Sequence, residues 1–322
     1  MRILVTGGAG YIGSITSHQL IKAGHQVVVF DSLVNGNKDT VADLDLVIGE
    51  TQDIKFLINV INQKKIEAVI HFAAFIEMGE SMKDPYKYFY NNVFGSLQLI
   101  KAMIKTGVGK IVFSSSAGVY GNPERLPVKE DDRKEPTNPY GESKLMVEQL
   151  LAWFDKIHQL RSISLRYFNA AGATLDGKLG EAHRSESHLI PNILKAFIAG
   201  EEFVLHGDDY KTLDGTCIRD YIHVLDLAKT HILALEALVQ GHKTDFYNAG
   251  TGKGYSNKQV IEMVEKVTGK KVKVKIGPRR PGDANELVAD AAKFQKEFNW
   301  RPQHSDLRII IESAYNWHKR QG

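Results

Sequence analysis

The sequence predicts an α/β fold in which a doubly wound parallel sheet is joined to a second, smaller α/β domain. Short runs rich in β-branched residues alternate with helical segments through the first half of the chain, a pattern typical of parallel strands joined by crossover helices. Runs such as VVVF, AVIHFA and KIVFSSS are apolar at consecutive positions, as expected where helices cover both faces of a sheet. We predict strands at residues 3–6, 26–31, 44–49, 68–72, 110–114 and 162–168.

The second half of the chain is less regular. The segment 172–187 is rich in Gly, Asp and His, and a helix is expected at 190–199. A strand-like stretch at 246–248 precedes a helix expected at 257–268, and the alternation KKVKVK at 270–275 predicts a strand with one solvated face. We therefore assign a first domain to residues 1–168 and a second to 169–322, with some later segments returning to the first domain.

Composition limits the classes of partner. The 322 residues are 43% hydrophobic and 25% charged, which suits a large core, and 41 basic against 38 acidic residues leave a net charge of +3. That balance provides no broad field for a nucleic acid or a membrane surface. No apolar run approaches the about 20 residues of a membrane span. Cys217 is the only cysteine, which excludes an intrachain disulfide and fits a reducing, cytoplasmic location. The chain opens on a strand pattern, so we expect no leader to be removed.

A glycine-rich loop, TGGAGYIG at 6–13, follows the first strand and precedes a helical stretch at 14–23. Glycines at this spacing permit a tight turn and bring the backbone close to a pyrophosphate at a helix N-terminus, as in a Rossmann domain. Asp31 ends the second strand, where its carboxylate suits an adenosine ribose. Residues 32–37 contain no Arg or Lys, so NAD is preferred to NADP. The alternative is an ordinary glycine turn, which the register of strand, loop, helix and acid disfavours.

Tyr140 and Lys144 lie four residues apart, on one face of a helix that continues to about residue 154. A nearby ammonium favours the phenolate and would make Tyr140 a base near neutral pH. Such a pair is common on surface helices, but Ser114-Ser115-Ser116 stands at the carboxyl end of a strand, where open α/β sheets bind ligands. The alternative for the serines is a capped strand end. We predict Ser116, Tyr140 and Lys144 as the catalytic residues.

The motifs along the chain resemble those of the extended short-chain dehydrogenase/reductase superfamily and, within it, the UDP-glucose 4-epimerase family. The resemblance covers nearly the whole chain and depends on TGGAGYIG, HFAA with MGES, NNVFGS, SSSAGVYG, YGESK, LRYFNAAGA, HLIP, DGTCIRDYIHVLDLA, YNAG and RRPGD. It implies an isomerase that uses NAD to oxidise a UDP-sugar reversibly at C4 through a 4-keto sugar, with Tyr140 as the base. It also implies a homodimer formed through helices of the first domain.

The resemblance also implies which residues bind the two ligands. The implied NAD-binding residues are Gly7, Gly10, Tyr11, Ile12, Gly13, Asp31, Ser32, Asn35, Gly36, Glu50, Thr51, Phe72, Ala73, Ala74, Asn92, Ser114, Tyr140, Lys144 and Phe168. The implied substrate-binding residues are Ser116, Tyr140, Asn169, His188, Leu189, Val204, Leu205, His206, Arg219, Tyr221, Leu287, Arg280 and Asp283. The planar guanidinium of an arginine suits phosphate oxygens.

The chain departs from the family pattern at two places, and a third position bears on the choice of sugar. The pair Gly49-Glu50 stands where relatives have Gly-Asp, and Ile76 and Glu77 lie in a segment where many relatives carry a Lys. We expect these changes to alter NAD affinity or exchange. Leu287 occupies the position that limits an N-acetyl group on the sugar, and its intermediate size favours glucose and galactose.

Other functions share parts of this pattern. An epimerase for N-acetylhexosamine or pentose nucleotide sugars remains open. A nucleotide-sugar 4,6-dehydratase or decarboxylase needs an acid beside the sugar ring, and the residue after Ser116 is Ala117. A non-catalytic NAD-sensing protein would have no use for Ser116, Tyr140 and Lys144 together.

One further cluster of side chains suggests a metal. His183 and His188 flank Glu181 and Glu186, but their spacing is neither helical nor typical of zinc sites. The epimerase-like HLIP motif accounts for His188, so we predict no metal.

Overall fold

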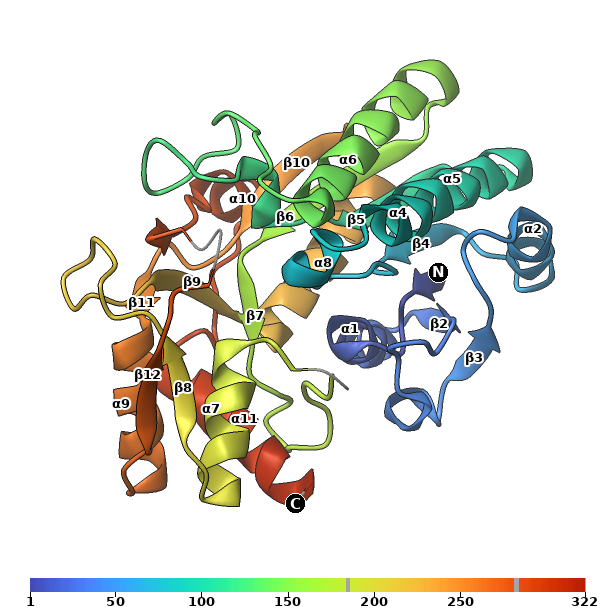
Figure 1. Ribbon diagram of the computed structural model, residues 1–322. Helices are drawn as coiled ribbons and strands as arrows, with labels where there is room; N and C mark the ends of the chain where they lie inside the picture. The colour runs from blue at the N-terminus through green and yellow to red at the C-terminus, as the bar shows by residue number, and fades with distance from the viewer. Residues whose placement is uncertain (184–185, 281–283, 322) are drawn as a thin grey trace. The chain divides into compact units, whose positions relative to one another are not determined.

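The computed structural model describes residues 1–183, 186–280 and 284–321 (Figure 1). Its chain divides into two compact units, each built from several segments. The first unit contains 1–122, 132–167 and 228–247, and the second contains 123–131, 168–227 and 248–322. No helix among the described residues has the length and apolar character needed to cross a membrane.

The first unit is built on a seven-stranded sheet in the order β10-β6-β5-β4-β1-β2-β3. The neighbours from β3 to β6 are parallel, so the predicted doubly wound fold is confirmed. The strands are β1 (Arg2–Thr6), β2 (Gln26–Asp31), β3 (Asp45–Ile48), β4 (Ala68–His71), β5 (Lys110–Ser114), β6 (Arg161–Tyr167) and β10 (Asp245–Ala249). Two of the predicted strands, at 26–31 and 110–114, have the predicted bounds.

Helices connect these strands along the chain. They are α1 (Tyr11–Lys22), η1 (Lys38–Val41), α2 (Ile54–Gln63), α3 (Met78–Ser81), α4 (Pro85–Tyr88), the π-helical η2 (Phe89–Phe94), α5 (Gly95–Thr106), η3 (Ala117–Tyr120), α6 (Pro139–His158) and α8 (Val224–Val239). The step from β1 to β2 runs toward one sheet edge, whereas those from β3 to β6 run toward the other. Because such crossovers are right-handed, α1 covers the opposite face from α2, α5 and α6.

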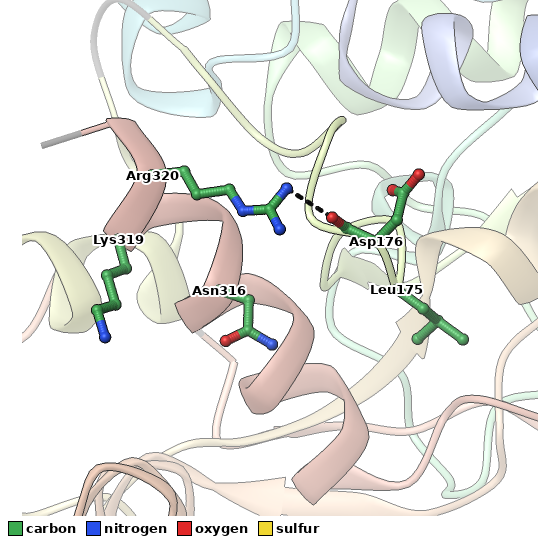
Figure 2. A pocket seen from close by; sticks show the side chains of 5 residues that line it. All are labelled: Leu175, Asp176, Asn316, Lys319 and Arg320. Carbon is green, nitrogen blue, oxygen red and sulfur yellow. Dashed lines mark hydrogen bonds between the residues drawn. The ribbon is translucent and has the colours of Figure 1, made fainter.

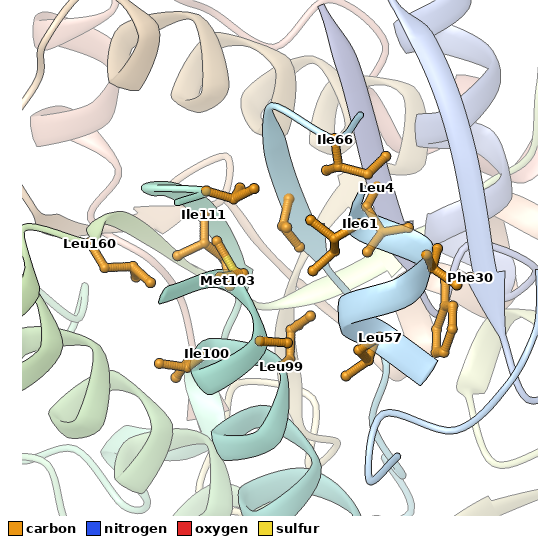
Figure 3. Packing of buried hydrophobic residues seen from close by; sticks show 14 of the residues in the cluster. Leu4, Phe30, Leu57, Ile61, Ile66, Leu99, Ile100, Met103, Ile111 and Leu160 are labelled. Carbon is orange, nitrogen blue, oxygen red and sulfur yellow. The ribbon is translucent and has the colours of Figure 1, made fainter. Parts of the chain in front are cut away.

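The core of the first unit lies between the sheet and the face covered by α2, α5 and α6. Figure 3 shows Leu4 and Phe30 of the sheet packed with Leu57 of α2 and with Leu99 and Met103 of α5, all nearly inaccessible to solvent. The strands are buried on consecutive residues, for example all four residues of β4. That burial explains why their sequences are apolar without alternation.

The second unit has two small sheets. In the first, β9 (Ile218–His223) pairs with β7 (Asn169–Ala171), β11 (Gly254–Ser256) and β13 (Glu286–Leu287); in the second, β8 (Phe203–His206) pairs with β12 (Val274–Gly277). Its helices are α7 (Leu189–Ala199), α9 (Asn257–Thr268), α10 (Ala292–Glu297) and α11 (Leu307–Gln321). Side chains of α7, α9 and α11 form a second hydrophobic core.

The strand predicted at 270–275 begins later than expected, at Val274. Gly269 ends α9 with a φ of 71°. The Glu265 carboxylate then accepts hydrogen bonds from Lys271 Nζ and from the Val272 backbone. These contacts hold the first residues of the alternating run against the end of α9, so pairing with β8 starts only after them.

Candidate active site

The glycine-rich loop after β1 is packed as tightly as the sequence predicts. A Cβ on Gly7 would lie 2.5 Å from the backbone nitrogen of Ala73, and a Cβ on Gly13 would lie 2.2 Å from Gly7 O. Gly7 also has a φ of 70°, in the left-handed region. In contrast, a Cβ on Gly10 would meet only Gly7 O, at 3.3 Å. Gly7 and Gly13 therefore allow close backbone packing, while Gly10 leaves room at the N-terminus of α1, where Tyr11 and Ile12 begin the helix.

The carboxylate of Asp31 is part of this loop. Asp31 Oδ2 accepts a hydrogen bond of 2.9 Å from Ala9 N, and Oδ1 accepts one of 2.8 Å from Leu33 N. Gly36 packs against the same carboxylate, since a Cβ there would lie 2.6 Å from Asp31 Oδ1. Burial raises the pKa of Asp31, and the two backbone hydrogen bonds oppose that rise. The structure thus gathers Asp31, Gly36 and the loop, with Ser32 and Asn35 between them in the chain.

The carboxyl ends of β3 and β4 bring further predicted residues to the same sheet edge. Glu50 and buried Thr51 follow β3, and a Cβ on Gly95 would lie 2.4 Å from Thr51 Oγ1. Phe72, Ala73 and Ala74 follow β4, with Phe72 N bonded to Thr6 O at 2.8 Å. The first contact joins the region after β3 to α5, and the second joins the carboxyl ends of β1 and β4; because these strands are parallel members of one sheet, their carboxyl ends lie along the same edge.

Asn92 lies in η2 and connects the segment after β4 to α6, the helix that carries Tyr140 and Lys144, which are predicted to be catalytic. Its side chain accepts from Phe75 N at 2.9 Å, donates to Phe75 O at 3.0 Å and donates to Ser143 Oγ at 3.0 Å. Ser143 in turn donates to Tyr140 O. Single π-helical turns are frequent at functional sites, and here the turn directs Asn92 toward α6.

The predicted catalytic residues come together at the end of β5. Ser116, Tyr140 and Lys144 are all buried. Tyr140 shares a hydrogen bond with Ser116, and Ser116 Oγ also accepts from Gly118 N at 3.0 Å. Lys144 Nζ donates to Ser114 O at 2.8 Å and lies 5.9 Å from the centre of the Tyr140 ring. The Asn138 side chain accepts a hydrogen bond from Gly141 N and so caps α6. The helix begins at Pro139, one residue before Tyr140.

Burial is the largest influence on the pKa values of Tyr140 and Lys144 in the chain without its cofactor. Burial raises the pKa of Tyr140; the hydrogen bond with Ser116 opposes the rise, and the charge of Glu77 adds to it. Burial also lowers the pKa of Lys144 to about 7, although Glu148 acts in the opposite direction. Desolvation thus disfavours both charged forms, and the expectation that Lys144 and an oxidised nicotinamide together favour the phenolate stays a prediction.

A buried ion pair, which sequence reasoning missed, lies behind the catalytic strand. Arg166 of β6 contacts the Glu148 carboxylate at 2.9 Å through Nε and 2.5 Å through Nη2, and it donates to Tyr120 OH at 2.9 Å. Ser115 Oγ donates to the same carboxylate at 2.5 Å. The sequence offered one indication of this pair: Glu148 lies four residues after Lys144, one helical turn further along the same face of α6.

Among the predicted substrate residues that the structure describes, Ser116 and Tyr140 belong to the first unit, and the others lie in the second unit and fall into small groups. In the first group, Leu287 of β13 is paired with Arg219 of β9, and Tyr221 of β9 with Asn169 of β7. Arg219 Nη1 donates to the carbonyls of Ile218 and Ala284, and Asn169 Nδ2 donates to Asp220 O. These four residues are therefore neighbours on one sheet.

The remaining substrate residues form two further groups. Val204, Leu205 and His206 belong to β8, paired with β12. His188 occupies the N-cap position of α7, Leu189 is the first residue of that helix, and Arg280 Nη1 donates to the adjacent Ser187 O at 3.1 Å. Phe168 follows β6, and Asp283 lies outside the described residues.

A shallow hollow in the second unit coincides with none of the predicted site residues. Leu175, Asp176, Asn316, Lys319 and Arg320 line it. Figure 2 shows Arg320 reaching toward Asp176, whose carbonyl accepts its hydrogen bond at 2.7 Å, while Lys319 points away. The guanidinium is thus engaged by the protein itself.

The four side chains that the sequence analysis considered as possible metal ligands lie close together in the structure. Donor atoms of Glu181, His183, Glu186 and His188 all lie within 4.8 Å of one another. Burial opposes the charged imidazoles, but the nearby Glu181 and Glu186 carboxylates outweigh it and raise the pKa of His183 to about 9 and that of His188 to about 10. Sequence spacing alone did not indicate this proximity.

Comparisons with known proteins agree with the fold. The model of the NAD dependent epimerase/dehydratase family matches residues 3–250. A UDP-glucose 4-epimerase from Lacticaseibacillus casei is 47% identical over 322 residues, covering 99% of this chain and 97% of the relative.

Solved structures give the same result. The UDP-glucose 4-epimerase from Brucella ovis in complex with NAD has a TM-score of 0.95 at 43% identity, covering 98% of this chain and 97% of that one. The UDP-Glc/GlcNAc 4-epimerase from Campylobacter jejuni has a TM-score of 0.86 at 39% identity, covering 99% of both chains. The predicted use of NAD is thereby confirmed, and the chain belongs to the NAD-dependent epimerase/dehydratase family.

Proposed function

We propose that the protein is a UDP-glucose 4-epimerase that interconverts UDP-glucose and UDP-galactose. The observation that carries the proposal is the gathering of Ser116, Tyr140 and Lys144 at the sheet edge that bears the glycine-rich loop. The relative from Lacticaseibacillus casei, 47% identical over nearly the full length, carries that name.

The residues at this edge fit NAD. Gly7 and Gly13 have no space for a side chain, whereas a Cβ on Gly10 would have only one near contact. With no side chains at these positions, a pyrophosphate can approach the backbone N–H groups at the start of α1. The Asp31 carboxylate lies against the loop, which suits a ribose and disfavours a 2′-phosphate. The adenosine side would take Phe72, Ala73 and Ala74, and the nicotinamide side Asn92 and Lys144.

NAD, when bound, supplies reversible acceptance of a hydride from the sugar C4. The protein side of the reaction is proton transfer and orientation. Tyr140 takes the proton of the 4-hydroxyl as C4 is oxidised and returns it to the oxygen as C4 is reduced on its other face. Ser116 holds the same oxygen through the hydroxyl that already bonds Tyr140. Protonated Lys144 would reduce the cost of the buried phenolate when it forms, because an opposite charge nearby favours the anion.

The second unit provides residues suited to a UDP-sugar. Arg219 and Arg280 are placed by backbone carbonyls, and guanidinium groups bind phosphate oxygens through paired hydrogen bonds. Leu287 stands beside Arg219 in the register of β13 and β9, so its side chain would limit the bulk of the sugar. This position favours glucose and galactose over N-acetylated sugars.

A 4,6-dehydratase is the less favoured alternative. Its chemistry needs an acid next to the catalytic serine, but the neighbours of Ser116 are Ser115 and Ala117. Ser115 is turned into the core and donates to Glu148, so its hydroxyl is engaged away from a substrate.

The test is to give the purified protein UDP-galactose with no added oxidant and to follow the appearance of UDP-glucose. We expect the two sugars to equilibrate. Tyr140→Phe should lose turnover by several orders of magnitude while it retains NAD, whereas Tyr315→Phe, on α11 in the second hydrophobic core, should remain active. A protein that holds NAD without interconverting the sugars contradicts the proposal.

A homodimer is proposed for the active species. Tyr86, Tyr90 and Phe94 follow one another at helical spacing, with stacked rings and exposures of 75%, 46% and 38%. Trp153 and Ile157 of α6 are 62% and 66% exposed. These exposed apolar side chains are the surfaces that we assign to the proposed interface. In sedimentation experiments, Trp153→Glu combined with Tyr86→Glu should convert a dimer to a monomer; a monomeric wild type would contradict the proposal.

The cytoplasm is the proposed compartment, and no nucleic acid partner is proposed. The single buried cysteine, Cys217, suits a reducing environment, and the net charge of +3 offers little attraction to polyanions. Fractionation of cells that express the protein tests the first point.

A further inference from the structure

The segment that leads into α7 places four potential metal ligands around one point in the second unit. Nδ1 of both histidines faces the same carboxylate oxygen, Glu181 Oε1, at 3.1 Å from His183 and 2.5 Å from His188. Glu186 closes the group, with Oε2 at 3.8 Å from His183 Nδ1 and Oε1 at 3.3 Å from His188 Nδ1. The segment thus contributes two imidazole nitrogens and two carboxylates.

The spacing of these donors suits a four-coordinate ion. Zinc bonds to nitrogen or oxygen of about 2.0–2.1 Å in a tetrahedron keep the donor atoms about 3.3–3.4 Å apart. The four donor separations above, from 2.5 to 3.8 Å, lie on both sides of that value. One donor atom from each of the four residues lies within 4.8 Å of all the others, so the four side chains already surround a common point.

Two of the four donor atoms lack a hydrogen bond within the described part of the chain, although both have ion-pair contacts. Among the described residues, His183 Nδ1 and Glu186 Oε2 are buried without a hydrogen bond of acceptable geometry. The Glu186 side chain is only 5% exposed, and that of Glu181 only 4%. Lys195 Nζ lies 3.8 Å from Glu186 Oε2, which is too long for a hydrogen bond. Buried polar atoms left in this state are costly, and a cation between them removes the cost.

We propose that Glu181, His183, Glu186 and His188 form a binding site for a divalent transition-metal ion of the zinc type. Imidazole and carboxylate are zinc ligands, and four protein donors with no remaining position indicate a structural rather than a catalytic ion. The His188 side chain is 44% exposed, which gives the ion a path from solvent.

The position of the site indicates what the ion would stabilise. His188 occupies the N-cap position directly before α7, without a capping hydrogen bond from its side chain, and the carbonyl of Glu181 accepts a hydrogen bond of 3.0 Å from Trp317 Nε1 of α11. An ion shared by Glu181 and His188 would therefore fasten the segment to both helices of the second core. The competing arrangement has no ion and consists of two protonated histidines paired with the two carboxylates.

The experiment uses the full-length protein without an affinity tag, stripped with a chelator and returned to metal-free buffer. Titration with Co²⁺ should give the intense visible absorption of a tetrahedral ion at one equivalent per chain, and Zn²⁺ should displace it. His183→Ala and Glu186→Gln should each weaken binding by more than about 100-fold, since loss of outer-shell partners alone costs 10–100-fold.

His158→Ala is the matched control, because His158 is exposed at the end of α6, and its binding should equal that of the wild type. Circular dichroism establishes that each variant is folded; if both ligand variants unfold, the Co²⁺ spectrum of the wild type decides. Absence of stoichiometric binding, or equal binding in His183→Ala and the wild type, overturns the proposal in favour of the ion-pair network. The readout is metal binding, so it is independent of epimerase turnover.

Discussion

Replacing Arg166 by methionine removes the cation from the buried ion pair behind the catalytic strand. Arg166 is 1% exposed and Glu148 9%. The variant loses the contacts to both carboxylate oxygens and to Tyr120, so Glu148 keeps only the Ser115 hydroxyl among these partners. Stranding a buried charge in this way costs about 3–5 kcal/mol.

The expected change in melting temperature follows from chain length. An unfolding entropy of about 2.1 cal/mol/K per residue over 322 residues amounts to about 0.7 kcal/mol/K. The variant should therefore melt about 4–7 °C lower than the wild type, as measured by circular dichroism. Epimerase activity should fall as well, because Ser115 adjoins Ser116 and Glu148 raises the pKa of Lys144.

Two controls separate the buried charge from lost packing. Arg308→Met breaks an exposed pair, Arg308 to Glu312 at 2.8 Å, and should shift the melting temperature by about 1 °C or less. The double variant Arg166→Met with Glu148→Leu removes both charges and should recover at least about 2 kcal/mol relative to Arg166→Met. An Arg166→Met shift no larger than that of Arg308→Met, or no recovery in the double variant, would refute the reasoning.

Three further predictions concern the active site. Glu77→Gln removes a charge that raises the pKa of Tyr140, so the rising limb of the pH–rate profile should move to lower pH; an unmoved limb contradicts that role. Gly13→Ala would place a methyl 2.2 Å from Gly7 O and should abolish NAD retention, measured by cofactor content after purification, whereas Gly109→Ala, with its nearest contact at 3.8 Å, should retain NAD. Leu287→Ser should raise kcat/KM for UDP-N-acetylgalactosamine relative to UDP-galactose by about tenfold or more, and an unchanged ratio would remove Leu287 from the sugar pocket.

The first unit was largely predictable because its signals are local. Strands at 26–31 and 110–114 have their predicted bounds, since burial on both faces leaves consecutive apolar residues in the chain. The glycine-rich loop was equally clear, because only glycine allows the approach of Gly7 to Ala73. The start of β12 was not predictable, since it depends on contacts from Glu265 to residues six and seven positions later.

The amino-acid sequence by itself determined the fold class, the cofactor loop and the Tyr140 and Lys144 pair, because each is encoded by neighbouring residues or by one helical turn. Only the tertiary structure decided the pKa direction of Tyr140, the pairing of Glu148 with Arg166 and the convergence of His183 and His188 on Glu181. The physical reason is that these properties depend on burial and on distances across the fold. The sequence gives the identity of a carboxylate or an imidazole, but not whether water or another side chain surrounds it, and those surroundings determine its pKa.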